Sequence, residues 1–503
     1  MMTEIHWAQQ AGFPLLGTLQ ALPLLGAGLL LMLGERRGVV ILGRILVLAE
    51  LLLAATLYRR IDISSPALQM AERIDLLGPF GYHAAADGVT VLFVLLTALL
   101  SLLLSLYGLV RGLGEPGRLI GVLLAIEGVL MSLLTTTNLL WFVLASAIEI
   151  GLVGQLLWRW ATSPEKDLAL ARFYQFQGTG LLLLLAGVLV LGWSHADAVG
   201  GRWSFDLVEL ASIRIGTPLA SVVFFLLFYG LAIRTPLFPM HGWLPIVAKH
   251  GNVAIAPALL LGIKVGIYGL VRFVFPLVPE AVIQWHNFVV VFAAIGVFYA
   301  AFLAFLQKDL RRLIAFAVIS HTSLIVIGLF SLHPAGFQGG ILLAVNFGLA
   351  ATAMLFMVGF VYRRTRTTSL DRLGGLFDRI PFLSMTFLIG GFSIIGMPGT
   401  PGFDAAHLVL EAAIDKFGAL PTVAAALGNV ITAGFLLWAF QRAFLAPRPK
   451  WRPVGTIEAT LPMEYLVAGS VLTVLLVTGF YLEPWMKLIE ASLQALSTHY
   501  GHV

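Results

Sequence analysis

Residues 225–243 read FLLFYGLAIRTPLFPMHGW, an apolar run that ends in an arginine and two closely spaced prolines. Proline lacks a backbone N–H and breaks a helix, so Pro236 and Pro239 interrupt a segment that otherwise reads as a membrane span. Arg234 lies directly before the break. A charge at that depth is costly in a membrane, so this position is a candidate functional site.

A second stretch repeats the arrangement in the other half of the chain. Within residues 380–414, Pro398 and Pro401 interrupt an apolar run, and Asp404 and His407 follow three residues apart. Paired interrupted helices in two halves of a membrane protein are typical of a substrate or ion path near the bilayer midplane. The two stretches therefore predict a transport function.

The composition excludes a soluble globular protein. Of 503 residues, 59% are apolar and only 11% are charged, which indicates a polytopic membrane protein. There is no cysteine, which excludes disulfides and cysteine-ligated clusters in this chain. The basic residues lie in short loops, which does not indicate nucleic-acid binding. We expect no cofactor and no metal site in the chain, because glycine-rich nucleotide motifs are missing and the histidines lack metal-ligand spacing.

The apolar runs predict an all-α fold of about 14 transmembrane helices. They are centred near residues 24, 48, 98, 127, 149, 182, 226, 263, 296, 321, 350, 393, 433 and 473. Helices 7 and 12 are the broken ones, and their matched positions predict two inverted five-helix repeats. The expected divisions are 1–86 (helices 1 and 2 with a loop), 87–112 (helix 3), 113–276 (helices 4–8, first repeat), 277–446 (helices 9–13, second repeat) and 447–503 (helix 14).

The loops also predict an orientation. With an outer N-terminus, about two thirds of the 31 Lys and Arg residues fall on the cytoplasmic side. We therefore expect a multi-pass protein of the bacterial inner membrane with both termini outside.

Several ionisable residues fall at mid-span and are candidates for a proton path. They are Glu127, Glu149, Arg234, Lys264 and His321, with Asp404 and His407 after the second break. Lysine and histidine can exchange protons when buried, whereas arginine stays charged. Arg234 is therefore predicted to be a fixed partner of Glu127 or Glu149.

Each candidate has a structural alternative. Lys264 could extend from a helix end to the membrane surface, and His321 could be a hydrogen-bonded core residue. Asp404 could cap the resumed helix. Glu50, in the second predicted span, is a weaker candidate.

Four segments resemble the antiporter-like subunits of respiratory complex I, and within them the chain M type. They are residues 232–273 (AIRTPLFPMHGWLP, then APALLLGIKVGIYGLVRF), 304–331, 355–376 and 396–403 (GMPGTPGF). The resemblance covers roughly residues 87–444. It implies fourteen spans, inverted repeats and proton translocation along a central polar axis.

The resemblance also assigns roles to individual residues. Lys264 and His321 stand at a lysine and a histidine position of that axis, and Arg234 stands where the family has a lysine. The acid of the fifth span is expected at Ala147, two residues before Glu149. The acid of the twelfth span is expected at Ala406, between Asp404 and His407, and a histidine of the eleventh at Phe347.

The sequence thus predicts a proton-translocating, antiporter-like subunit of a complex I-related assembly. Its expected partners are other membrane and soluble subunits, lipid, and protons, with Na⁺ as the alternative ion. If the assembly is an enzyme, it is a translocase of the NADH:quinone oxidoreductase type, with no redox centre in this chain. Two alternatives stay open: a cation/proton antiporter subunit of the Mrp type, and the proton-driven membrane subunit of an inorganic-carbon uptake complex.

Overall fold

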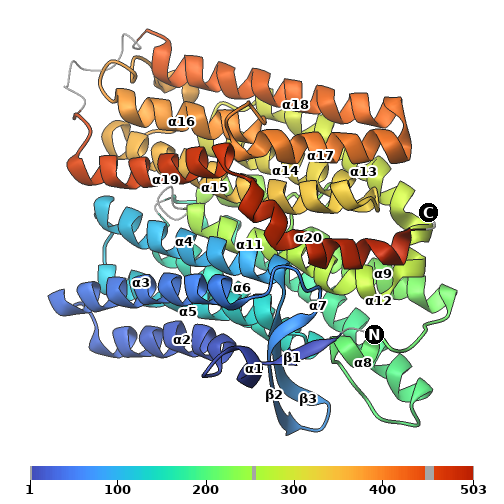
Figure 1. Ribbon diagram of the computed structural model, residues 1–503. Coiled ribbons are helices and arrows are strands. Elements are labelled where there is room, and N and C mark those ends of the chain that lie inside the picture. Colours follow the sequence, from blue (N-terminus) through green and yellow to red (C-terminus); the bar gives the residue numbers. More distant parts are fainter. Residues whose placement is uncertain (1–2, 162, 252–255, 448–457, 502–503) are drawn as a thin grey trace.

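The protein is a bundle of long helices, described by a computed structural model for residues 3–161, 163–251, 256–447 and 458–501 (Figure 1). Twelve of its helices are long and apolar enough to cross a membrane. They are α2 (Leu15–Leu33), α3 (Arg37–Arg60), α4 (Gly88–Val110), α5 (Pro116–Thr135), α6 (Leu139–Arg159), α7 (Lys166–Ala198), α9 (Thr217–Arg234), α13 (Pro279–Phe305), α14 (Leu310–Phe330), α15 (Pro334–Thr365), α18 (Ala419–Phe440) and α19 (Pro462–Phe480).

The two remaining predicted centres, 263 and 393, also lie in helices. The first lies in α11 (Ala256–Gly269), which continues as a π-helical turn (Leu270–Val274) and then as α12 (Phe275–Leu277). The second lies in α16 (Pro381–Ile394). Shorter helices are α1 (Trp7–Gln10), α8 (Leu207–Leu210), α10 (Leu244–His250), α17 (Pro401–Phe417) and α20 (Glu483–Ser497). The predicted helical membrane fold is confirmed, while the inverted repeats stay a prediction.

Proline fixes where several of these helices begin. Its ring suits the first helical turn, where a backbone N–H has no partner in any case. Proline is accordingly the first residue of α5, α13, α15, α16, α17 and α19. Inside the bundle, α14 and α15 are almost wholly buried, whereas α3 and α19 expose most of their surface. The buried pair forms the centre around which the others pack.

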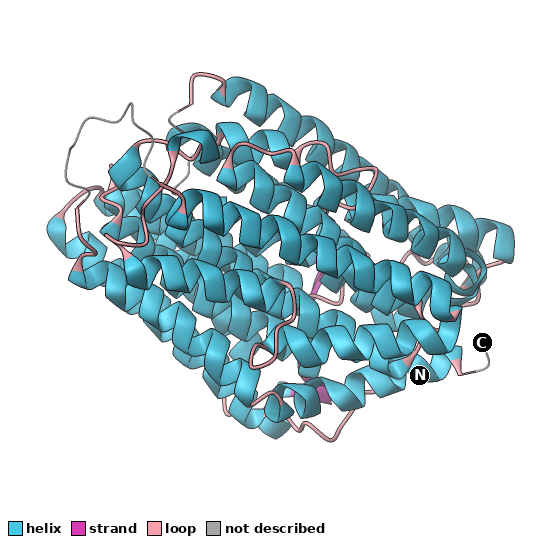
Figure 2. Cartoon of the chain, turned by 90° about the horizontal axis from the view of Figure 1, so that it is seen from above, coloured by secondary structure: helices cyan, strands magenta, loops and turns pink. Residues whose placement is uncertain are grey.

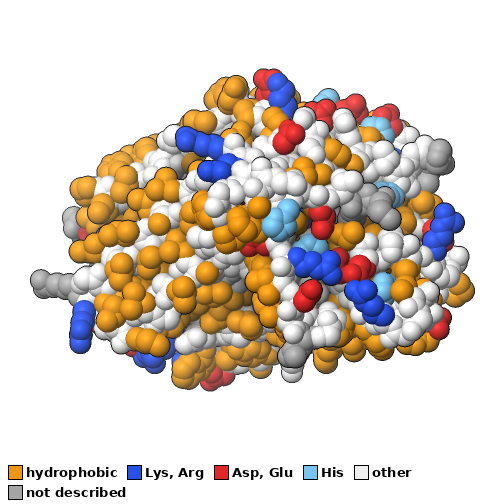
Figure 3. Space-filling view, turned by 60° about the horizontal axis from the view of Figure 1, so that its bottom comes forward, with side chains coloured by type: hydrophobic (Ala, Val, Ile, Leu, Met, Phe, Trp, Pro, Cys, Tyr) orange, Lys and Arg blue, Asp and Glu red, His pale blue; other side chains and the backbone are white. Residues whose placement is uncertain are grey.

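Hydrophobic side chains cover the flank of the bundle, and charged side chains gather toward one end (Figure 3). Both termini lie at one end of the bundle, in Figures 1 and 2 alike. Which side of the membrane this end faces stays a prediction.

A small three-stranded sheet lies at this end and was not predicted by the all-α reading. Strands β2 (Leu68–Leu77) and β3 (Phe80–Ala86) are antiparallel, and β1 (Glu4–His6) pairs parallel to β2. The sheet is fixed to the bundle because the Glu72 carboxylate accepts hydrogen bonds from the backbone N–H groups of Leu16 and Gly17, at 2.7 and 2.8 Å. A carboxylate at a helix N-terminus is favourable, so this contact stabilises the start of α2.

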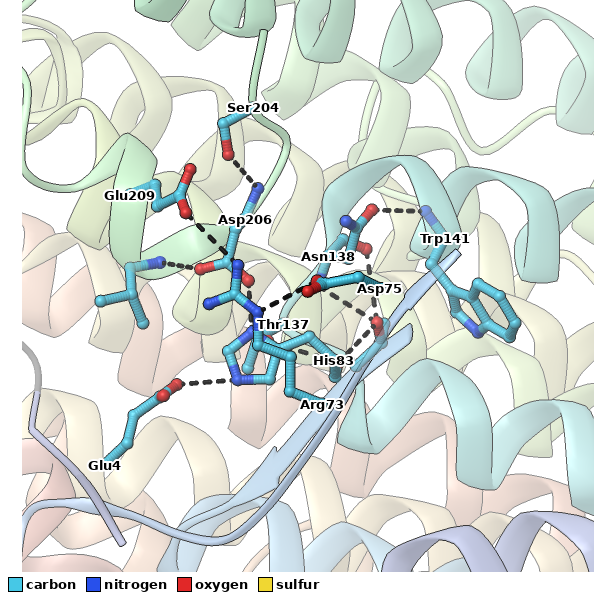
Figure 4. A network of polar contacts seen from close by, with 12 residues as sticks. Glu4, Arg73, Asp75, His83, Thr137, Asn138, Trp141, Ser204, Asp206 and Glu209 are labelled. Carbon is cyan, nitrogen blue, oxygen red and sulfur yellow. Dashed lines mark hydrogen bonds and ion pairs between the residues drawn. The ribbon is translucent and has the colours of Figure 1, made fainter. Parts of the chain in front are cut away.

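His83 joins the sheet to the loop ahead of α8 (Figure 4). Its Nδ1 contacts the Asp206 carboxylate, and its Nε2 lies 2.9 Å from Glu4 Oε1. Burial opposes protonation, but the two carboxylates outweigh it and raise the pKa of His83 to about 9. The doubly paired imidazolium therefore holds three separate segments together at neutral pH.

This pairing predicts a loss of stability in alkali. Because the folded-state pKa lies above the usual 6.5, the stabilisation is complete below pH 6.5 and disappears as the pH rises through about 9. A raised pKa of this size corresponds to roughly 3 kcal/mol. When the pH is raised from 7 to 10, the temperature of the thermal unfolding midpoint should decrease in the native protein. It should decrease less in His83→Gln. Equal pH profiles for the two proteins would contradict the pairing.

Candidate functional site

The first predicted break occurs where the sequence placed it. Helix α9 ends at Arg234, and the chain turns through residues 235–243 before α10 begins. In a membrane every backbone group must find a partner inside the protein. The Trp243 indole N–H donates to the Ile233 carbonyl at 3.0 Å, and the Leu237 N–H donates to the Ala232 carbonyl at 2.9 Å. The break is thus closed by its own residues.

The second break, between α16 and α17, is closed by amide side chains. Asn346 of α15 donates to the Ser393 carbonyl at 2.9 Å and accepts from the Ser393 hydroxyl at 2.6 Å. Asn429 of α18 donates to the Ile395 carbonyl at 2.7 Å. Both broken helices are confirmed, and their freed carbonyls are satisfied by neighbouring side chains.

A buried ion pair lies at the first break. Arg234 Nη2 is 2.9 Å from Glu149 Oε2 of α6, and both side chains are almost completely buried. This is one of the two partnerships that the sequence predicted for Arg234. Glu149, Arg234 and Gln177 of α7 line a cavity of about 20 Å³, which is room for about one water molecule.

The structure corrects the expected place of the acid in α6. Ala147, the position derived from the resemblance, faces outward, whereas Glu149 faces the interior. An acid two residues away on a helix points in a different direction. Glu149 therefore occupies the inward position, and the acid is not displaced from the bundle interior.

Lys264 is buried beside α15. Its Nζ has no hydrogen-bond partner among the residues that the structure describes. Gly348 of α15 provides the space, since a Cβ at that position would overlap the Lys264 ammonium. Gly262, two residues earlier on α11, likewise makes room for the Glu149 carboxylate. Sequence reasoning missed both glycines, although each stands in a predicted span.

His321 lies on α14 but meets the same helix, α15. Its ring stacks on Phe347 of α15 with 4.8 Å between centroids, next in sequence to Gly348. The side chain is buried, and its Nε2 has no partner in the described part of the chain. Lys264 and His321 thus pack against adjacent residues at the centre of α15.

Glu127 is fully buried on α5, and neither carboxylate oxygen has a partner among the described residues. Its polar neighbours are Glu50 of α3 and Ser101 of α4. The structure therefore places Glu127 with Glu50, which the sequence ranked as a weaker candidate, and pairs Arg234 with Glu149 alone.

Asp404 and His407 do not join the buried groups. Both lie on the exposed face of α17, while Ala405, Ala406 and Val409 occupy the buried face. The helix packs against α15 through its small residues, so the two polar side chains point the other way. Their part in the proton path stays a prediction. Among the described residues, no group of three His, Asp or Glu side chains is placed to hold a metal ion.

Comparisons with known proteins identify relatives of this arrangement. The sequence signature of the NADH:quinone oxidoreductase/Mrp antiporter transmembrane family matches residues 118–432. The chain is 30% identical to NADH-quinone oxidoreductase subunit M of Pseudomonas aeruginosa, over 85% of this chain and 84% of that protein. It is 29% identical to subunit M of Mycobacterium tuberculosis, over 97% and 95%.

Solved structures share the fold. A chain of respiratory complex I from Thermus thermophilus with bound NADH is 29% identical, with a TM-score of 0.84 over 96% of this chain and 99% of that one. A chain of the Mrp complex from Dietzia sp. DQ12-45-1b has a TM-score of 0.86 over 97% and 98%. At 18% identity, that likeness concerns the fold alone.

The buried ion pair predicts that the loss of stability depends strongly on which residue replaces Arg234. Arg234→Ala leaves Glu149 buried without a counter-charge and should destabilise the protein by about 3–5 kcal/mol, whereas Arg234→Lys should be milder. Thermal unfolding in detergent measures this, with Arg172→Ala, an exposed arginine of α7, as the control. The double variant Glu149→Gln/Arg234→Met should recover part of the loss. An Arg234→Ala protein as stable as the control would show that the pair contributes little.

Proposed function

The chain belongs to the NADH:quinone oxidoreductase/Mrp antiporter family of membrane proteins, and from this membership we propose that it moves protons across the membrane as one subunit of a complex I-related assembly. In this proposal the proton path runs through the polar groups at the bundle centre. Partner subunits provide the driving reaction.

The observation that carries the proposal is the buried ammonium of Lys264, which has no partner among the described residues. A buried charge without a partner is costly, so such groups in a membrane mark transport sites more often than structural ones. Lysine can release its proton when its surroundings disfavour the charge, whereas arginine cannot. Lys264 is therefore the proposed central proton carrier.

The neighbouring groups supply entry and continuation. The Glu149 carboxylate, paired with Arg234, lies against Gly262, which is less than one helical turn from Lys264. The charge of this pair therefore acts on the Lys264 ammonium at short range. Arg234 keeps its charge and holds the Glu149 carboxylate in place. His321 stacks on Phe347, the neighbour of Gly348 in α15, and is the next titratable group in the direction of α14.

Lys264→Met tests the central step. The variant removes the titratable amine and keeps an apolar side chain of similar length, so coupled proton transport should be abolished while the complex still assembles. Lys249→Met, at an exposed lysine of α10, is the matched control and should transport at the native rate. Native proton transport by an assembled Lys264→Met complex would exclude Lys264 as the carrier.

The chain on its own should be inactive. It contains no cysteine to ligate an iron–sulfur cluster, and the driving reaction belongs to its partners in this proposal. Reconstituted alone into vesicles, it should neither reduce quinone nor build a proton gradient, as followed by absorbance and a pH-sensitive dye. Rapid cation/proton exchange by the isolated chain would instead favour a secondary antiporter of the Mrp type.

A further inference from the structure

The second repeat offers few titratable groups beyond the bundle centre. In the described residues of α13 to α18, the buried ionisable side chains are His286, His321 and Arg364, and the Arg364 guanidinium stays charged and is paired with Glu464 of α19. Asp404 and His407, which the sequence proposed for the outer half of the path, lie on the exposed face of α17. A proton that reaches Lys264 therefore finds no continuous buried titratable route through α17.

The helix that carries Lys264 provides another route. Tyr268 follows Lys264 by four residues, and Arg272 follows Tyr268 by four. Residues four apart lie on one helical face, with about 5–6 Å between their Cβ atoms. The face that begins at Lys264 thus runs along α11 and the π-helical turn toward the end of the bundle where both termini lie (Figure 1). Single π-helical turns often occur at functional sites.

Tyr268 and Arg272 form one hydrogen-bonded cluster with the start of α4. The Tyr268 hydroxyl is 3.0 Å from Thr90 Oγ1, and Arg272 Nε donates to the same hydroxyl at 3.1 Å. Arg272 Nη2 donates to Asp87 Oδ1 and to Thr90 Oγ1, each at 2.6 Å. Asp87 neutralises the guanidinium, so the cluster presents no net positive charge to an approaching proton.

The cluster forms the inner wall of a cavity of about 370 Å³. Asp87, Tyr268 and Arg272 line it, together with Ala495 of α20, while exposed residues such as Thr498 and His499 form its rim. Tyr268 is itself almost fully buried, and its hydroxyl also donates a hydrogen bond to the Leu134 carbonyl of α5 at 2.5 Å.

We propose that this cavity is a proton opening of the chain, connected to Lys264 through Tyr268 and Thr90 and closed off by α20. The inference rests on the proposed role of Lys264. Because Lys264 Nζ and the Tyr268 hydroxyl are not hydrogen-bonded to each other, water carries the Lys264 proton to the Tyr268 oxygen. The Tyr268 hydroxyl then gives up its hydrogen bond to the Leu134 carbonyl and releases its own proton to Thr90, which passes one proton on to water in the cavity. Each hydroxyl gains one proton and loses one, so no charge is left behind. Asp87 and Arg272 hold both hydroxyls in position.

Cysteine chemistry tests the cavity in the assembled complex. The chain contains no cysteine, so Ala495→Cys introduces one thiol of this chain into the cavity. A membrane-impermeant cationic methanethiosulfonate, added on the side that the termini face, then attaches a fixed positive charge there. Coupled proton transport should slow by about tenfold or more after modification, and also in Tyr268→Phe, which lacks the hydroxyl.

The controls separate a proton opening from a merely structural pocket. Gln494→Cys places a thiol on the exposed surface of the same helix, outside the cavity, and its modification should leave transport unchanged. The complex with the native chain and the same reagent corrects for cysteines of partner subunits. Ala495→Cys is modified after assembly, so it gives an answer even if Tyr268→Phe impairs folding.

Two results would overturn the inference in distinguishable ways. If Lys264→Met is inactive but modified Ala495→Cys and Tyr268→Phe transport at the native rate, the opening lies elsewhere and Lys264 keeps its role. If Lys264→Met transports normally, the proposed function fails, and the opening fails with it.

Discussion

The bilayer interior offers no water to a broken helix, and the centre of this protein is built around that constraint. Each carbonyl that a helix break exposes must be satisfied by another part of the chain. At the first break Trp243 supplies the donor, and at the second break Asn346 and Asn429 do so. The positions of α15 and α18 beside the breaks follow from these contacts. The breaks in turn bring charged and polar residues into the interior.

The two breaks use different chemistry. The first closes around an ion pair, Glu149 with Arg234, and lies near Lys264, whose ammonium has no partner in the described part of the chain. The second closes around neutral amides and a hydroxyl, and the face of α17 that packs inward is made of small apolar residues. Ionisable groups are therefore concentrated on the side of α5, α6, α9 and α11. The end of α11 with Tyr268, and the π-helical turn after it with Arg272, extend that polar region toward the surface.

Small residues set the distances between the charged groups. Gly262 lets the Glu149 carboxylate approach α11, and Gly348 lets the Lys264 side chain lie against α15. A glycine in a helix interior lowers helix stability by about 0.5–1 kcal/mol relative to alanine. That cost is small beside the several kcal/mol required to bury an unpaired charge at the wrong distance. The arrangement of charges thus depends on positions that carry no charge themselves.

The sequence by itself determined the class of the protein, the membrane helices and both broken segments. Apolar runs long enough to span a bilayer, and prolines that interrupt them, act through local physics that needs no tertiary contact. It also identified Glu149, Arg234, Lys264 and His321, because an ionisable residue within an apolar run can be recognised from the sequence alone.

The direction in which a side chain points was decided only by the tertiary structure. Helix rotation turns Glu149 inward and Ala147 outward, and it leaves Asp404 and His407 exposed. The pairing of β1 with β2, the Glu50–Glu127 neighbourhood and the cluster of Asp87, Thr90, Tyr268 and Arg272 join segments far apart in sequence. Their formation depends on how neighbouring helices pack, which no single stretch of the chain encodes.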